Sequence, residues 1–217
     1  MTIRVFLADD HAMLRDGLQF LLETQPDIRV VGSAADGRAA VRLVAQLLPD
    51  VVLMDITMPE LNGIEATAQI RAACPATQVV ILSMHSTSEH IYRALQAGAL
   101  GYLLKESAGA EVAIAVRVVH AGRRYLSPRI AEFMPELMAS LAAAPRAKSP
   151  LESLSPRERQ VLQLVVEGHS SAVIAAELAL SPKTIDTYRS RLMLKLGIGD
   201  LPSLVKFAIE HRLTPGT

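Results

Sequence analysis

The sequence predicts an α/β protein in which a doubly wound, five-stranded parallel sheet precedes a smaller all-α domain of four helices. Apolar runs and amphipathic stretches alternate through residues 1–122, as in consecutive β-α units. A stretch rich in alanine, with proline near both ends, follows at 142–150. Only helical patterns come after it. The first part is therefore expected to form a layered sheet, and the last part a helical unit.

Five short apolar runs are the predicted strands. They are Ile3–Ala8, Arg29–Ala34, Val51–Met54, Gln78–Met84 and Gly101–Leu104. Short apolar runs bounded by polar or turn-forming residues are typical of strands that are buried on both faces of a parallel sheet. Because β-α-β crossovers are right-handed, the carboxyl ends of these strands should share one edge of the sheet.

Amphipathic stretches between the strands are the predicted helices on the two faces of the sheet. They are Met13–Glu23, Arg38–Leu47, Gly63–Ala72, Ser88–Gln96 and Ala110–Ala121. A further helix is expected after Ser127, which is suited to cap it, with Pro128 at the first helical position. We expect residues 1–122 to form the first domain, and residues 123–150 to form a linker that contains this helix.

The C-terminal domain, residues 151–217, is predicted to contain a helix-turn-helix. Its helix boundaries follow from serine caps, from prolines at the first helical position and from glycines after the last one. The predicted helices run from Ser155 to Gly168, from Ser170 or Ser171 to Leu178, from Ser181 to Gly197, and from Leu201 to His211. The interval between the second and third helices has the length of the tight turn in a helix-turn-helix.

Composition narrows the class of protein. Lys and Arg together number 22, as do Asp and Glu, so no global charge indicates a nucleic-acid partner. The single cysteine, Cys74, excludes a disulfide framework and fits a reducing cytoplasm. No apolar run approaches the length of a transmembrane helix. The sequence therefore predicts a cytoplasmic protein without a membrane partner.

Charged and polar side chains end several of the predicted strands. Asp9 and Asp10 follow the first, Asp55 the third and Lys105 the fifth, and Ser83 lies at the end of the fourth. Each one alone would be read as a cap or a solvated charge, but at a shared edge they indicate a pocket. Carboxylates suit Mg²⁺, and the metal and Lys105 would neutralise charge on a phosphoryl group attacked by Asp55. The hydroxyl of Ser83 can hydrogen-bond the resulting acyl phosphate.

At these residues the chain resembles the receiver domain of bacterial response regulators. The matching segments are Leu7-Ala8-Asp9-Asp10-His11, Val52-Leu53-Met54-Asp55-Ile56 with Met58-Pro59 and Gly63, Leu82-Ser83, and Ala97-Gly98-Ala99 through Lys105. The resemblance implies a flavodoxin-like fold in which a sensor histidine kinase phosphorylates Asp55. It also implies that Asp10, Asp55 and the carbonyl of Thr57 bind Mg²⁺ directly, with Asp9 acting through water.

The same resemblance assigns roles around the phosphoryl group. Lys105 would pair with it. Ser83 and Tyr102 would form a switch in which the hydroxyl moves toward the phosphate and the ring follows inward. A plain half-buried strand aromatic is the alternative interpretation of Tyr102.

Loop residues near the site are further candidates. Thr57 and His85 should border the path of the attacking water and are candidates to set the phosphoryl lifetime; for His85, a solvent-exposed loop histidine is the alternative. Glu106 departs from the pattern, because many receivers follow the lysine with proline.

Local basic charge marks the third helix of the C-terminal domain. Residues 183–195 hold four basic residues and one acid, a net charge of +3, whereas residues 1–124 have a net charge of −2. Basic charge on a helix suits contact with DNA phosphates. Ile185, Leu192 and Leu196 form an apolar stripe toward the core, so the opposite face should point toward a DNA groove.

This domain resembles the LuxR-type helix-turn-helix. The matching segments are Leu154–Arg159, Glu167-Gly168, Ile174–Leu178, Ser181–Ile185 and Lys195–Gly197. Joined to the receiver, it resembles the NarL/FixJ family of response regulators, which implies double-stranded promoter DNA as partner and a homodimer on phosphorylation. The predicted DNA-contacting residues are Lys183, Thr184, Thr187, Tyr188, Arg189, Arg191 and Lys195. Tyr188 stands where histidine is common, which changes a phosphate donor without removing it.

Three other classes of protein compete with this prediction. An aspartate-nucleophile phosphatase is disfavoured, because Asp55-Ile56-Thr57 lacks the second acid of the Asp-x-Asp motif. An adaptor acting by protein contacts alone would not bind DNA. A ligand-sensing LuxR-type regulator would need an aromatic-lined pocket in residues 1–122. The preferred prediction is a transcription factor switched by aspartyl phosphorylation, with no enzymatic activity beyond its own phosphoryl transfer and autodephosphorylation.

Overall fold

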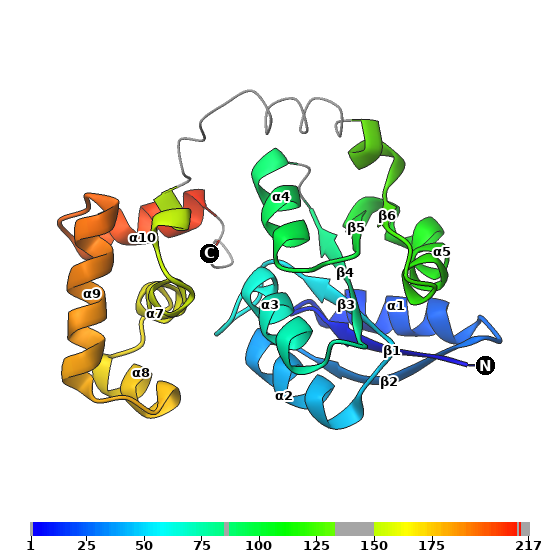
Figure 1. Ribbon diagram of the computed structural model, residues 1–217, viewed down its shortest axis with the longest axis horizontal. Helices are drawn as coiled ribbons and strands as arrows, with labels where there is room; N and C mark the ends of the chain where they lie inside the picture. Colours follow the sequence, from blue (N-terminus) through cyan, green and yellow to red (C-terminus); the bar gives the residue numbers. More distant parts are fainter. Residues whose placement is uncertain (1, 85–86, 133–149, 212, 214–217) are drawn as a thin grey trace. The chain divides into compact units, whose positions relative to one another are not determined.

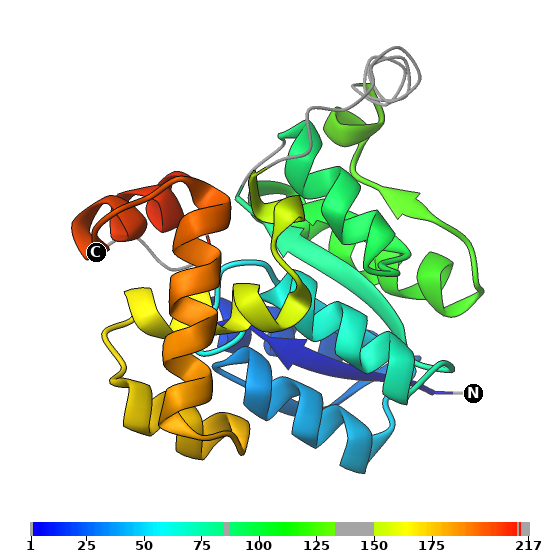
Figure 2. The same ribbon diagram turned by 60° about the vertical axis from the view of Figure 1, so that its left-hand side comes forward.

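The computed structural model divides the chain into two compact units, Met1–Ala142 and Ala143–Thr217 (Figure 1, Figure 2). The described residues are 2–84, 87–132, 150–211 and 213. Of the alanine-rich linker stretch predicted at 142–150, only Pro150 lies within them. Each unit has hydrophobic core clusters of its own. In the part of the chain that is described, no helix is long and apolar enough to cross a membrane.

A parallel sheet forms the centre of the first unit. Its strands are β1 (Ile3–Ala8), β2 (Ile28–Ala34), β3 (Val51–Asp55), β4 (Gln78–Ser83), β5 (Gly101–Leu104) and β6 (Tyr125–Leu126). They pair in the order β2-β1-β3-β4-β5-β6, and every pair is parallel. The chain winds outward from β1 in one direction to β2 and in the other to β3. The carboxyl ends of β1 and β3 therefore meet at the switch point, where open α/β sheets bind their ligands.

The sheet has six strands, so the prediction of five was wrong. β6 is two residues long and pairs with β5 through Gly101↔Tyr125 and Tyr102↔Leu126. Two residues carry no periodic signal, and their pairing with β5 is a tertiary contact that local patterns do not encode. Residues 125–126 thus belong to the sheet, although they lie in the segment that the sequence assigns to the linker.

Helices cover both faces of this sheet. They are α1 (Ala12–Glu23), α2 (Gly37–Leu47), α3 (Gly63–Ala73), α4 (Ser88–Gln96) and α5 (Ala108–His120), with a short 3₁₀ turn, η1 (Lys105–Ser107), before α5. Alternate strand residues point to opposite faces. Phe6 and Met54 therefore pack with α2, α3 and α4, whereas Val5 and Leu53 pack with α1 and α5.

Two glycines allow the loop after β3 to fold closely against its surroundings. A Cβ at Gly63 would lie 1.8 Å from the carbonyl oxygen of Asp55, and one at Gly37 would lie 1.8 Å from that of Leu61. Because these neighbours are backbone atoms, they cannot rotate away as a side chain would. The backbone of Asp55 is thus held against the start of α3, and glycine is the residue that fits there.

Every helix or strand described in the second unit is a helix, and their order matches the predicted one. It contains η2 (Pro150–Ser153), α7 (Pro156–Val166), α8 (Ser171–Leu178), α9 (Pro182–Leu196) and α10 (Leu201–Glu210). The predicted serine caps are confirmed: Ser155 forms a capping box with Glu158, and Ser170 and Ser181 cap α8 and α9. Ala179 has a φ of 53° in the turn between α8 and α9, which completes the helix-turn-helix.

We expect Gly63→Ala to lower the free energy of unfolding by about 3 kcal/mol or more, because the new methyl group would overlap a backbone oxygen. Gly17→Ala is the matched control. Gly17 lies exposed in α1 with nothing within 4 Å of an added Cβ, so alanine should be neutral or stabilise by up to about 1 kcal/mol. Urea unfolding followed by circular dichroism measures both. Equal stability of Gly63→Ala and the wild type would contradict the close approach at Asp55.

Candidate functional site

Charged side chains from three strand ends meet at the carboxyl edge of the first unit's sheet. Nζ of Lys105 lies 2.7 Å from Oδ2 of Asp9 and 2.7 Å from Oδ2 of Asp55. The exposed fractions of these side chains are only 7%, 2% and 4%, respectively. The strand register, with Ala8 beside Met54, aligns the ends of β1 and β3. Two buried carboxylates therefore share one buried ammonium.

Asp10 and His11 complete the rim of this pocket. Ligand atoms of Asp9, Asp10, His11 and Asp55 all lie within 4.8 Å of one another. Nδ1 of His11 is 2.7 Å from Oδ1 of Asp10 and 3.2 Å from Oδ1 of Asp9, and its backbone N–H donates to Asp9 at 2.9 Å. The sequence did not single out His11 as a site residue, although its position directly after two acids is a signal that could have found it.

This acidic cluster can bind a metal ion. Three carboxylates face one ammonium, which leaves two negative charges close together in a largely buried pocket. Oδ1 of Asp10 is buried and has no hydrogen-bond partner apart from the contact with Nδ1 of His11 at 2.7 Å, so this oxygen can serve as a ligand atom. The donors are hard oxygens, which Mg²⁺ and Ca²⁺ prefer. Both the charge and the donor set fit a divalent cation.

Burial governs the ionisation of Asp55. Removal from water raises the pKa of Asp55 to about 6, and the negative charge of Asp9 adds to this effect. Lys105 and the backbone N–H of Thr57 act in the opposite direction. Burial also works against the charge on Lys105, but Asp55 and Asp9 together raise its pKa. Asp55 is thus ionised at neutral pH, but the folded state pays a free-energy cost for that charge.

The remaining predicted site residues lie around this cluster. Ser83 is 1% exposed and lies beside Leu104 in the strand register. Tyr102 is fully buried in the core that includes residues of α4. It is therefore not the half-buried strand aromatic of the alternative interpretation. Thr57 is half-buried in the loop after β3. His85 lies outside the described residues, so the expectation for it stays a prediction.

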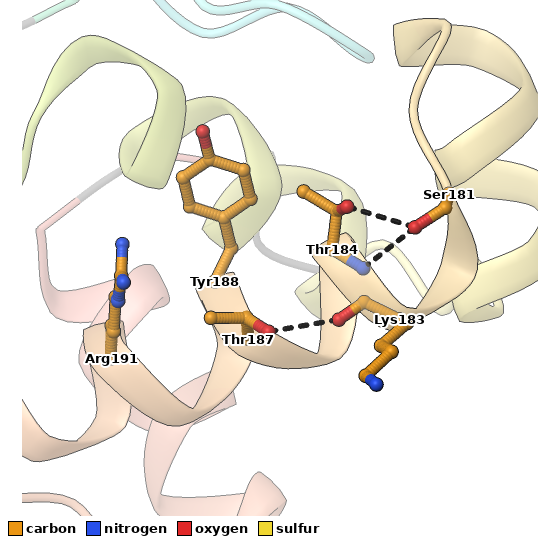
Figure 3. Close-up of a pocket in the computed structure, with 6 residues that line it drawn as sticks. All are labelled: Ser181, Lys183, Thr184, Thr187, Tyr188 and Arg191. Carbon is orange, nitrogen blue, oxygen red and sulfur yellow. Dashed lines mark hydrogen bonds between the residues drawn. The ribbon is translucent and has the colours of Figure 1, made fainter.

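The second unit places most of its predicted DNA-contacting side chains around one open pocket on α9. Together with Ser181, the pocket is lined by Lys183, Thr184, Thr187, Tyr188 and Arg191 (Figure 3). Ser181 Oγ accepts the N–H of Thr184 at 3.1 Å, and Thr187 Oγ1 donates to the carbonyl of Lys183 at 2.9 Å. The ring of Tyr188 and the guanidinium of Arg191 extend to the same side of the helix (Figure 3).

Two other predicted DNA-contacting residues are bonded within the unit. Nη1 of Arg189 donates to Oγ of Ser171 at 3.1 Å, and this hydroxyl donates to Asp186 at 2.7 Å. Nζ of Lys195 lies 2.7 Å from Oε2 of Glu158, whose carboxylate also accepts a backbone N–H at the start of α7. These bonds tie α8 and α7 to α9. Arg189 and Lys195 therefore help to hold the helix that carries the pocket.

Comparison with known proteins matches both units. The family model described as the response regulator receiver domain matches residues 5–117, and the one described as bacterial regulatory proteins, luxR family, matches residues 152–208. The transcriptional regulatory protein LiaR of Bacillus subtilis (strain 168) is 38% identical over 211 residues, which cover 97% of this chain and 99% of that protein.

Solved structures give the same result. A LuxR-family two-component response regulator from Aurantimonas sp. SI85-9A1 is 42% identical, with a TM-score of 0.61, over 64% of this chain and 99% of that one. A structure of two RcsB dimers bound to two parallel DNAs is 25% identical, with a TM-score of 0.61, over 96% of this chain and 98% of that one. A receiver joined to a LuxR-type DNA-binding domain defines a transcriptional response regulator. The chain belongs to the NarL/FixJ family of these regulators.

We expect Asp55→Asn to stabilise the metal-free protein at pH 7.5 by up to about 3 kcal/mol, because a buried charge with a raised pKa is removed. The folded wild type binds a proton more readily than the unfolded chain. The destabilising contribution of Asp55 should therefore fall as the pH drops from about 6 toward the ordinary value of 3.8, and the stability difference between Asp55→Asn and the wild type should shrink. Urea unfolding in EDTA across this range is the measurement. An Asp55→Asn variant less stable than wild type at pH 7.5 would contradict it.

Proposed function

We propose that a sensor histidine kinase phosphorylates this regulator on Asp55, and that phosphorylation controls its binding to promoter DNA. The observation that carries the proposal is the buried contact of Lys105 with Asp9 and Asp55 at the carboxyl edge of the sheet. In the transfer, the phosphorus–nitrogen bond of the kinase phosphohistidine breaks and a bond forms from phosphorus to a carboxylate oxygen of Asp55. The histidine is released unmodified.

Each residue of the pocket has a proposed part in that step. Mg²⁺ is the proposed cofactor, with Asp10, Asp55 and the carbonyl of Thr57 as direct ligands and Asp9 acting through water; when bound, it neutralises charge on the transferred oxygens. Lys105 exchanges Oδ2 of Asp55 for a phosphoryl oxygen, and its contact with Asp9 keeps the ammonium in reach.

The switch is proposed to run through Ser83 and Tyr102. Ser83 is buried at the end of β4, where its hydroxyl can turn toward a phosphoryl oxygen. Tyr102 packs in one core with Ile91 and Ala94 of α4, so any displacement of the ring acts on that helix. Hydrolysis later returns Asp55 to its free form by autodephosphorylation.

Two loop residues are proposed to set how long the phosphoryl group lasts. Thr57 and His85 each follow a site residue by two positions, and this spacing is the basis for proposing that both act on the attacking water. Bulk or hydrogen bonding at these positions would slow or guide that water. Replacing either one is therefore expected to act on the rate of hydrolysis more than on the rate of phosphorylation.

We assign a separate function to each part of the chain. Residues 1–122 act as the receiver, 123–150 as the linker and 151–217 as the DNA-binding domain, with β6 tying the start of the linker to the receiver sheet. The contact clustering and the spans of the two family models support this division. The cytoplasm is the proposed location, because the partner is DNA.

We also propose that the phosphorylated regulator is a homodimer on DNA. Two domains then span half-sites about one helical turn apart, and each raises the effective concentration of the other. The structure of RcsB dimers bound to DNA supports this arrangement. The proposed contacts to phosphates and bases are the pocket residues of Figure 3, whereas Arg189 and Lys195 are assigned to holding α9 in place.

Beryllofluoride or acetyl phosphate with Mg²⁺ should increase DNA binding and the sedimentation coefficient of the wild type. Asp55→Asn should respond to neither, because it lacks the attacking carboxylate. Electrophoretic mobility shift and analytical ultracentrifugation measure the two effects. An unchanged response in Asp55→Asn would refute the switch, and no DNA binding at low salt in any state would favour an adaptor instead.

Lys183 and Lys195 should differ although both are basic residues of α9. Lys183→Ala is expected to reduce the slope of log affinity against log salt by about 1, because one phosphate contact is lost. Lys195→Met should leave that slope unchanged and instead lower the free energy of unfolding by about 1 to 2 kcal/mol, since Glu158 is left buried without its partner. Fluorescence anisotropy with labelled DNA and urea unfolding measure these effects. The opposite pattern would reverse the two assignments.

A further inference from the structure

The strand that carries Lys105 into the site is unequally supported on its two sides. β4 pairs with β5 along its whole length, from Gly101 to Leu104, whereas β6 covers only Gly101 and Tyr102 (Figure 1). Leu104, the residue before Lys105, therefore lies beyond the end of β6. A buried backbone N–H without an acceptor is costly, so a partner must come from elsewhere.

Ser127 supplies that partner. Its Oγ accepts the N–H of Leu104 at 3.2 Å and donates its own hydrogen to Oε2 of Glu111 at 3.0 Å. Its backbone N–H donates to the carbonyl of Tyr102 at 3.0 Å, and the residue is 0% exposed. A hydroxyl can accept and donate at once. Ser127 thus continues the hydrogen-bonding of β5 where the chain turns away into helical residues 128–132.

Neighbouring contacts hold Ser127 at this position. The hydroxyl of Tyr125 donates to the same oxygen of Glu111 at 3.0 Å. Burial, together with this hydrogen bond, raises the pKa of Tyr125 to about 12, so the phenol stays protonated and remains a donor. Ile130 is fully buried in the same core as Tyr102. The segment on both sides of Ser127 is therefore anchored to the receiver.

The residue after Lys105 is held by the same segment. Arg129 forms an ion pair with Glu106. Both side chains are more than half exposed, so this pair is weaker than the buried bonds of Ser127. Lys105 itself opens the turn η1, and no proline ring follows it to fix the backbone. Side chains of residues 127–129 thus hold the chain immediately before and immediately after Lys105.

We propose that Ser127 is a positioning residue for Lys105, and that through it the start of the linker responds to the phosphoryl group on Asp55. This inference rests on the proposed function, in which Lys105 leaves Asp55 for a phosphoryl oxygen. A shift of the backbone at Lys105 would strain the bond between Leu104 and Ser127 and act on residues 128–132. Because the bond from Ser127 to Leu104 holds the chain that carries Lys105, a change at Ser127 is also expected to alter how Lys105 is placed for the reaction at Asp55.

The test compares full-length variants by their rate of phosphorylation with acetyl phosphate at saturating Mg²⁺, followed by intact-mass spectrometry. Ser127→Ala should be slower by about tenfold, because Lys105 is no longer held in place. Ser127→Thr, which keeps the hydroxyl, should recover most of the rate. Ser33→Ala, an exposed serine on β2 at the opposite edge of the sheet, should match wild type. Calorimetric Mg²⁺ affinity of Ser127→Ala should not fall, since Lys105 is not a ligand and its positive charge competes with the cation for Asp9 and Asp55.

A double-mutant cycle separates positioning from general destabilisation. In a Lys105→Met background, Ser127→Ala should cause no further slowing, because its effect acts through the lysine. Equal slowing in both backgrounds, or a parallel loss of Mg²⁺ affinity, overturns the proposal. If Ser127→Ala does not fold, the same cycle with Ser127→Cys decides, because a thiol keeps a side chain at this position but accepts a hydrogen bond only weakly. Slowing that disappears in Lys105→Met supports the proposal, and an unchanged rate overturns it.

Phosphorylation of the wild type distinguishes failure of the proposed function from failure of the positioning role of Ser127. A wild-type chain that gains no phosphoryl mass refutes the proposed function, and the role of Ser127 with it. A wild type that reacts, combined with an additive cycle, refutes only the positioning role.

Discussion

The receiver depends on one buried electrostatic arrangement, in which Lys105 lies between Asp9 and Asp55. An ionised carboxylate buried alone would be expensive, and two of them side by side more so. The ammonium of Lys105 offsets part of this cost. Burial and the charge of Asp9 nevertheless keep the pKa of Asp55 raised. The net negative charge that lowers stability is also what the proposed Mg²⁺ ion and the proposed exchange of partners by Lys105 would act on. Stability and function are therefore coupled at this pocket.

The backbone around the pocket is built to keep these charges in place. Gly63 lets α3 begin against the carbonyl of Asp55, and Ser127 accepts the N–H that precedes Lys105. Neither residue touches the reacting oxygens in the proposed mechanism. In the second unit, the contact of Lys195 with the buried Glu158 has a comparable role, since it joins α7 to α9, the helix that carries the pocket proposed to contact DNA.

Much of this structure could be predicted from local signals. The strands β1 and β5 and the helix α4 have the predicted bounds, because an apolar run or an amphipathic face determines each one. Serine caps located the starts of α7, α8 and α9. The convergence of Asp9, Asp55 and Lys105 followed from the handedness of parallel crossovers. The pairing of Lys195 with Glu158 could not be predicted, because it depends on how α7 packs against α9, and no rule of chain handedness or local pattern determines that packing.

The sequence by itself determined the two-domain organisation expected here, the order of the elements and the chemical types that meet at the sheet edge, because periodicity, capping and strand ends are local properties. Only the tertiary structure decided that β6 joins the sheet and that Ser127 bonds across to Leu104 and Glu111. Those features depend on which distant segments become neighbours, and a two-residue strand or a single hydroxyl carries no pattern that identifies its partner.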